Sequence, residues 1–279
     1  GCFLRLPLTN HNLAFASLLS RLQMNTSLSY PTIAAQQRKL AQLYDLQLDI
    51  MPQLFGNQII LMYYANFVEP IEVLDPDYTY EEIIQTISQI IRFPAYDNNL
   101  FDYAKRQLED EYREIMVHPS NYALDRFFKL WYEDQPEYAE NFMGPIDEIK
   151  NTTIVEMRDF IENLRDIPMA VIGMGRDNQL MTKILRNIFK GAGIIKKFQV
   201  SDLVIPAKRK LIEKVDEQDN IQAQLLMGFG FKQRISYQEQ VVGLLLEQYL
   251  AGDQSSKLFS QIREELGAAY DVQADIVKK

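Results

Sequence analysis

The feature that most constrains the fold is a switch between helical and strand patterns over residues 153–189. Thr153-Ile154-Val155-Glu156 is a capping box, in which the threonine hydroxyl bonds forward to a free N–H of the first helical turn and the glutamate carboxylate bonds back. Pro168–Gly173 is a short apolar run typical of a buried strand, and Asn178–Phe189 has helical periodicity. A helix, a strand and a helix in this order predict a domain that contains both kinds of element.

The segments before this unit carry the same two patterns. Gln47–Met51 and Asn57–Ala65 are predicted strands joined across Phe55-Gly56-Asn57, a hairpin signal. Asn98–Val117 is predicted to be a long helix that Pro119 ends. A further strand is expected over Gly1–Leu8, and further helices over Ala14–Leu22 with Asn10 or Asn12 as the cap, Thr32–Leu43, Tyr80–Ile91, and Tyr122–Trp131 with Ser120 as the cap.

The character of the sequence changes over Phe198–Asp219, where an apolar run is followed by Pro206 and a mixed-charge stretch. The elements predicted near and after this stretch are an exposed strand over Lys210–Val215, a strand over Ile221–Phe231, a helix from the capping box Ser236-Tyr237-Gln238-Glu239 to Leu250, a helix over Gln254–Leu266 closed by Gly267, and a strand over Ala269–Val277. We therefore predict a first domain over residues 1–198, a linker and hairpin over 199–220, and a second domain over 221–279. About sixty residues contain too few elements to cover both faces of a sheet, so we expect the second domain to be incomplete.

Composition excludes several classes of protein. The net charge of −9, from 29 basic and 38 acidic side chains, argues against a nucleic-acid or anionic-membrane binder, because nothing offsets repulsion from phosphates. The longest apolar runs are far short of the about 20 residues that a membrane-spanning helix needs. Cys2 is the single cysteine, and His11 and His118 lack the spacing of two zinc ligands on one helix face. Because Gly1 is not followed by a signal peptide, we expect a cytoplasmic protein with a trimmed N-terminus.

Two other motifs have ordinary explanations. Gly173-Met174-Gly175 would need glycine or alanine at position 178 to be a dinucleotide fingerprint, and Asn178 stands there, so we interpret the motif as a tight turn. The acidic group at Glu109, Asp110, Glu111 and Glu114 is interleaved with basic residues, and a surface of ion pairs is the expected interpretation.

The most informative stretch is Ser255–Tyr270, in which Leu258, Phe259, Ile262 and Leu266 form an apolar stripe. Arg263 lies at the edge of this stripe, and Tyr270 begins the next predicted element after Gly267. The two side chains could therefore meet across the corner. A guanidinium beside a phenol provides donors suited to a peptide carbonyl or a carboxylate, although an ion pair between Arg263 and Glu264 or another acid would be the more ordinary arrangement.

This stretch resembles a segment of the insulinase/pitrilysin-like metallopeptidases, the inverzincins. Their second domains carry a Ser-x-Leu-Phe-x-x-Ile/Leu-Arg-Glu-x-x-Gly-x-Ala-Tyr pattern, matched here from Ser256 to Tyr270. The helix, strand and helix that begin at Thr153 are similar to the end of that family's first domain. The resemblance implies an α+β fold of two homologous domains, each a mostly antiparallel sheet with helices on one face, the second incomplete here.

The sequence departs from the family at the metal site. Active members have His-x-x-Glu-His on an early helix, where two imidazoles bind zinc and the glutamate polarises a water. The corresponding window here is Ser17-Leu18-Leu19-Ser20-Arg21, in which serine hydroxyls are poor zinc ligands and Arg21 would repel the cation. Glu111 falls where the third ligand would be expected, and alone it cannot hold a metal. We expect this chain to bind no cofactor.

The resemblance implies a function. Related processing peptidases pair a zinc-bearing subunit with a zinc-free homologue that contributes an arginine and a tyrosine. By this likeness, the chain would be the substrate-binding subunit of a heterodimeric zinc peptidase that cleaves unfolded peptides. It would be inactive alone, with Arg263 and Tyr270 bonding to the substrate carbonyl. The expected partner is a homologous zinc-bearing subunit, or a second copy of the chain. The alternative is a peptide-binding or scaffolding protein without chemistry.

Overall fold

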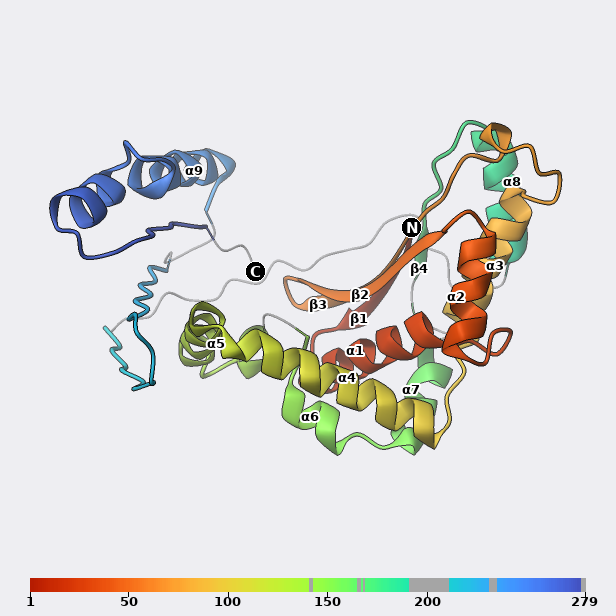
Figure 1. The fold of residues 1–279 in the computed structure, drawn as a ribbon, viewed down its shortest axis with the longest axis horizontal. Coiled ribbons are helices and arrows are strands. Elements are labelled where there is room, and N and C mark those ends of the chain that lie inside the picture. Colours follow the sequence, from red (N-terminus) through yellow and green to blue (C-terminus); the bar gives the residue numbers. More distant parts are fainter. Residues whose placement is uncertain (141–142, 165–166, 168, 191–210, 231–234, 277–279) are drawn as a thin grey trace. The chain divides into compact units, whose positions relative to one another are not determined.

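The hairpin predicted around Gly56 forms one edge of the sheet in the computed structural model. β2 (Gln47–Phe55) and β3 (Gln58–Asn66) pair antiparallel, and Gly56 turns with a φ of +58°, which glycine adopts without steric cost. β1 (Cys2–Pro7) pairs with the other side of β3, and β4 (Met169–Val171) pairs with β1. The strand order is therefore β2-β3-β1-β4 with every pair antiparallel (Figure 1), and together with the helices this sheet confirms the α+β class.

The structure describes residues 1–140, 143–164, 167, 169–190, 211–230 and 235–276. The chain divides into two units, Gly1–Asp202 with Asn220–Leu226, and Leu203–Asp219 with Met227–Lys279. Most of the predicted linker, residues 199–210, lies outside the described residues, so the predicted domain boundaries stay predictions. None of the helices in the described residues is long and apolar enough to cross a membrane.

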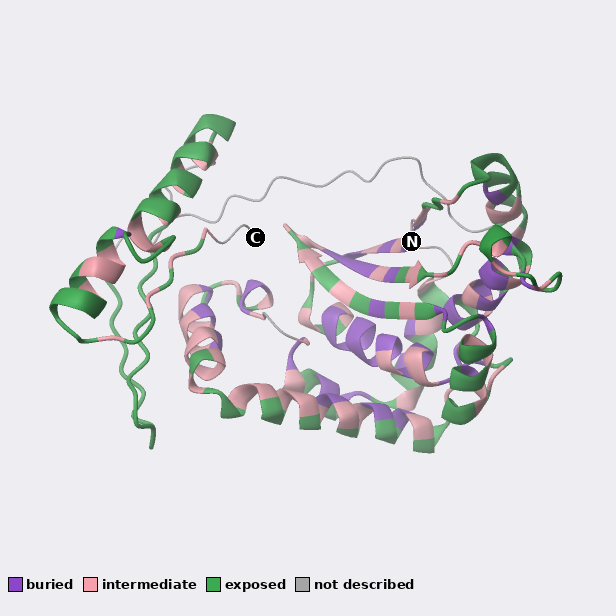
Figure 2. Cartoon of the chain, turned by 45° about the horizontal axis from the view of Figure 1, so that its top comes forward, coloured by how far each residue is buried: buried purple, intermediate pink, exposed green. Residues whose placement is uncertain are grey.

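Helices pack against one face of the sheet in the first unit. α1 (Asn10–Asn25) lies against the strands, and α4 (Asn98–Val117), α6 (Ile146–Asn151) and α7 (Ile154–Asn163) gather on the same side (Figure 1). Figure 2 shows buried residues concentrated on α1 and the strands. The remaining helices of this unit are α2 (Ile33–Gln42), α3 (Tyr80–Arg92), α5 (Pro119–Trp131) and α8 (Asn178–Ile188), with 3-10 turns at Pro70–Glu72 and Pro136–Tyr138.

Most predicted helices begin where their caps indicate. Both capping boxes are confirmed, at Thr153 and at Ser236. The predicted caps of two other helices were wrong. Thr9, and not Asn10 or Asn12, caps α1, because its hydroxyl accepts from the N–H of Asn12. α5 starts at Pro119, before Ser120, because proline fits the first helical position, where no N–H partner is needed.

In the second unit, α9 (Tyr237–Ala251) is followed by a π-helix over Phe259–Glu265. This helix starts later than Gln254 because the carboxylate of Asp253 bonds to both the N–H and the hydroxyl of Ser255 and forms a turn there. Gly267 has a φ of +58°, which fits its predicted role as the residue that ends the helix.

Three predicted strands are absent from the described residues that follow residue 210. Residues 211–215, 221–230 and 269–276 have no strand conformation, while Lys210, Phe231 and Val277 lie outside the described residues. The side chains of Ile221, Leu225 and Phe229 are more than 80% exposed. Alternation predicts which side of a strand is apolar, but a strand also needs a neighbour to complete its hydrogen-bond ladder, and no described segment supplies one.

Candidate functional site

The degenerate metal window, Ser17 to Arg21, lies on α1, a helix that packs against the sheet and has many buried residues. Ser17 and Ser20, on α1, are 2% and 4% exposed. Ser20 donates its hydroxyl to the carbonyl of Ser17 at 2.7 Å. The Ser17 hydroxyl has no hydrogen-bond partner among the described residues. Because residues three and four apart share a helix face, Ser17, Ser20 and Arg21 lie on one side of α1.

The structure brings Arg21 and Glu111 together across two helices. The Nη2 atom of Arg21, on α1, donates to the Oε2 atom of Glu111, on α4. The two side chains are 28% and 36% exposed. The Nε atom of Arg21 is buried and has no partner in the described part of the chain. Of the four residues predicted for the window, Ser17 and Ser20 are buried on α1, and Arg21 and Glu111 form a direct ion pair.

This window does not fit a zinc ion. Its one carboxylate, Glu111, already binds a guanidinium, and the two serines offer only neutral hydroxyls. Among the described residues, no group of three or more histidine, cysteine, aspartate or glutamate side chains is arranged to hold a metal.

Gly144 covers the buried end of the window, and sequence reasoning missed it. Its φ is +96°, and a Cβ atom built on it would lie 3.1 Å from Cγ of Leu13 and 3.4 Å from Oγ of Ser17. Any other residue here would be strained by the positive φ and would crowd Leu13. The signal that could have found it is the Gly144-Pro145 pair directly before α6, which is typical of a tight turn.

The arginine and tyrosine of the second unit are both exposed. The guanidinium of Arg263 stacks over the ring of Phe259, one turn earlier, at 4.6 Å from the ring centroid. Tyr270 is 79% exposed. No hydrogen bond between Arg263 and Tyr270, and no ion pair from Arg263 to Glu264 or another acid, is present within the described residues. The role predicted for this pair stays a prediction.

The acidic group on α4 divides between two roles. Glu109 and Asp110 form ion pairs with Arg113, at 3.8 Å and 2.9 Å, on the exposed side of the helix. This confirms the interpretation of a charged surface for those two residues. Glu111, by contrast, turns to Arg21 on the neighbouring helix.

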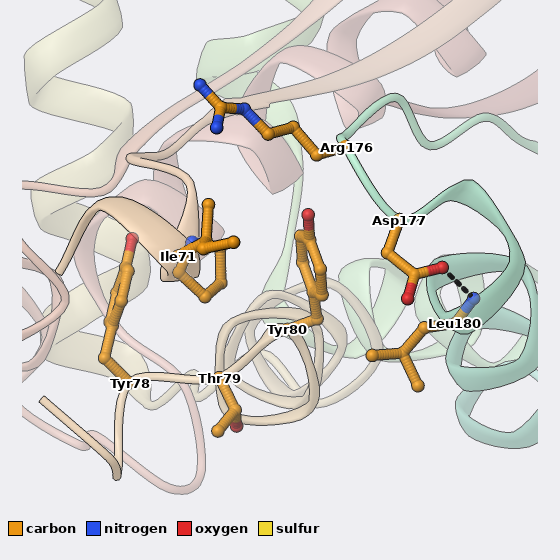
Figure 3. Close-up of a pocket in the computed structure, with 8 residues that line it drawn as sticks. Ile71, Tyr78, Thr79, Tyr80, Arg176, Asp177 and Leu180 are labelled. Carbon is orange, nitrogen blue, oxygen red and sulfur yellow. Dashed lines mark hydrogen bonds between the residues drawn. The ribbon is translucent and has the colours of Figure 1, made fainter. Parts of the chain in front are cut away.

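A pocket of about 280 Å³ lies where the N-termini of α3 and α8 meet (Figure 3). Tyr80 donates its hydroxyl to the carboxylate of Glu69, and burial together with this bond raises the pKa of Tyr80, so the phenol stays neutral at physiological pH. Figure 3 shows the rings of Tyr78 and Tyr80 on either side of Ile71. The pocket is lined by Pro70, Ile71, Tyr78, Thr79, Tyr80, Arg176, Asp177 and Leu180.

The glycine motif beside this pocket serves packing. A Cβ atom on Gly173 would lie 2.5 Å from Sδ of Met181, and one on Gly175 would lie 2.6 Å from Cε of the same residue. Asn178 accepts from the N–H of Gly175 and Asp177 caps α8, which fits a tight strand-to-helix turn.

The chain is similar to known proteins over most of its length. Residues 153–278, from the capping box onward, match the family described as peptidase M16 inactive domain. The "Probable inactive metalloprotease YmfF" of Bacillus subtilis (strain 168) is 21% identical over 277 residues, which are 95% of this chain and 63% of that protein.

Solved structures share the fold. A conserved protein from Enterococcus faecalis V583 superposes with a TM-score of 0.79 at 18% identity, over 99% of this chain and 66% of that one. A peptidase M16 inactive domain from Pseudomonas fluorescens superposes with a TM-score of 0.62 at 15% identity, over 98% of this chain and 64% of that one. In each comparison, this chain spans less than two thirds of the relative's length.

Proposed function

Because this chain is a relative of the insulinase/pitrilysin-like metallopeptidases and matches their M16 inactive domain over residues 153–278, we propose that it is the zinc-free, substrate-binding partner of a zinc-bearing M16 peptidase. The observation that carries this proposal is the ion pair of Arg21 with Glu111, which takes up the one carboxylate of the window where active members hold their metal. The partner would supply the zinc, and this chain would hold the peptide. The activity, substrates and partners of the whole protein are all part of the proposal.

Arg263 and Tyr270 are the proposed contribution of this chain to the reaction. Both side chains are exposed, and the stack on Phe259 holds the guanidinium of Arg263 in a restricted position. Two donors of this kind can bond to the scissile carbonyl and to the negative charge that develops on it. Loss of one such donor typically costs about 3 to 4 kcal/mol of transition-state stabilisation.

The proposed substrate is an unfolded, basic peptide. The net charge of −9 favours basic segments, and strand addition to a sheet edge is a common way to bind an extended chain. β2 is the terminal strand of the sheet as described, and its outer backbone groups are the proposed site for such a strand.

The test mixes this chain, in its full-length form, with its zinc-bearing homologue and a quenched fluorescent peptide. We expect cleavage to require both chains. Arg263→Ala and Tyr270→Phe should each lower kcat by about 100-fold or more, the usual effect of removing one oxyanion donor. Arg113→Ala and Tyr237→Phe serve as controls, because Arg113 is an exposed arginine on α4 and Tyr237 is as exposed as Tyr270.

A second candidate is a scaffold that binds without chemistry. The exposed apolar residues of α9, including Leu245 and Tyr249 at 66% and 61% exposure, favour an interaction surface there. In that case the zinc-bearing homologue would cleave at the same rate with and without this chain. A second copy of the chain is the other proposed partner, and the cytoplasm is the proposed location.

A further inference from the structure

Two buried polar groups in the window need a partner that the described protein groups do not provide. The hydroxyl of Ser17 and the Nε–H of Arg21 are both buried and unpaired among the described residues. Ser17 is 2% exposed, so its hydroxyl cannot turn to bulk solvent. Leaving such a group without a hydrogen bond is costly, and most buried polar groups in proteins are paired. The window therefore offers a donor and a hydroxyl to a ligand that supplies an acceptor.

The charges around these groups select the kind of acceptor. The guanidinium of Arg21 repels a cation, and the carboxylate of Glu111, bonded to that guanidinium, repels an anion. A neutral oxygen meets neither repulsion. The backbone carbonyl of a peptide is such an oxygen, and it is the acceptor most abundant in an extended chain.

We propose that the Ser17–Arg21 window of α1 binds a backbone carbonyl of an extended peptide, with Arg21 as the donor. This inference rests on the proposed function, since it names a contact that the same peptide makes with this chain. Glu111 acts as a positioning residue, because it accepts from Nη2 and leaves the other N–H groups of the guanidinium for the ligand.

Access to the window agrees with this role. The side chains of Arg21 and Glu111 are 28% and 36% exposed, so a ligand can reach the guanidinium from solvent. At the buried end, a Cβ atom on Gly144 would touch the Ser17 hydroxyl at 3.4 Å and crowd Cγ of Leu13 at 3.1 Å. Gly144→Ala is therefore expected to weaken peptide binding, and the positive φ of Gly144 makes this variant a secondary test.

The experiment measures the binding of a fluorescein-labelled, unstructured, lysine-rich peptide to the full chain by fluorescence anisotropy. Arg21→Met keeps an unbranched side chain as far as the position of Nε and removes the donors, and we expect Kd to rise about tenfold. Arg21→Lys keeps the charge but loses the Nε donor, so it should also weaken binding. Ser17→Ala should weaken it less. Circular dichroism of each variant checks the fold, and Ser17→Ala remains a test if Arg21→Met does not fold.

Arg113→Met is the matched control, because Arg113 is an arginine on α4 whose side chain is 71% exposed. A peptide with one backbone carbonyl replaced by a thiocarbonyl, which is a weaker acceptor, should lose affinity at one position for the wild type and not for Arg21→Met. If the wild type binds no peptide, the proposed function fails. If it binds and Arg21→Met, Arg21→Lys and Ser17→Ala bind equally well, the proposed function stands, and the window inference is wrong because solvent satisfies its polar groups.

Discussion

At the residue scale, Arg21 and Glu111 stabilise each other's charge by forming an ion pair in a partly buried position. Each side chain is about a third exposed, so water screens part of their attraction. The pair nevertheless joins α1 to α4 at a position where neither charge has another described partner. The resemblance to the metallopeptidase family indicated both residues, but it did not indicate that they bond to each other.

Removing one charge of this pair should destabilise the fold modestly. Glu111→Gln is expected to lower the free energy of unfolding by roughly 1 kcal/mol, because Arg21 loses its partner in a screened, half-buried site. Urea unfolding followed by circular dichroism measures the change. The matched control is Asp110→Asn, which removes one charge of the more exposed pair that Asp110 forms with Arg113 and should change stability less.

A charge swap separates the ion pair from the separate effects of the two side chains. The double variant Arg21→Glu with Glu111→Arg should recover part of the stability that either single substitution loses. A loss in the double variant equal to the sum of the two single losses would show that the two charges do not interact in solution.

At the element scale, the edge of β2 is shaped by one proline. Phe55 and Gln58 flank a two-residue turn, so they form a hydrogen-bonded pair, and alternation along the strand then points the backbone N of Pro52 to the free edge. Proline has no N–H, so the middle of this edge lacks a donor, which is a known way to limit strand pairing.

Restoring this donor tests where the peptide binds. If a peptide adds to β2, Pro52→Val should tighten its binding by about threefold to tenfold, the value of one hydrogen bond, in the anisotropy assay. Gln53→Val is the control, because its N–H faces β3. Unchanged affinity for Pro52→Val would mean that the peptide does not add to this strand.

Local sequence patterns predicted helices better than strands in this chain. α4 was predicted at its observed bounds, since its stop before Pro119 is a local signal, and the structure adds that Asp97 caps its start. The strand at Ile221–Phe231 was predicted from equally clear alternation and is absent over its described residues, because pairing depends on a distant neighbour and not on the strand itself.

At the scale of the whole molecule, the two units differ in how much apolar surface they bury. Both clusters of buried apolar side chains lie between Cys2 and Phe189, within the first unit. α9 has no buried residue, and Figure 2 shows the helices of the second unit mostly exposed. Because burial of apolar surface is the main driving force of folding, stability should reside in the first unit.

A fragment of residues 1–190 should therefore fold on its own. We expect a cooperative urea transition with a midpoint close to that of the full chain, measured by circular dichroism. The matching fragment of residues 211–279 should show no cooperative transition. A first fragment that stays unfolded would mean that its core depends on contacts from the rest of the chain.

The sequence alone determined the class of the fold, the capping boxes at Thr153 and Ser236, the hairpin at Gly56 and the loss of the metal motif, because each is written in residues close together in the chain. Only the tertiary structure decided that Arg21 meets Glu111, that Gly144 lies over Ser17, and that the alternating segments after residue 210 do not form strands in the described residues. These features depend on which distant segments come into contact. That outcome is set by the packing of whole elements, which no local spacing of residues records.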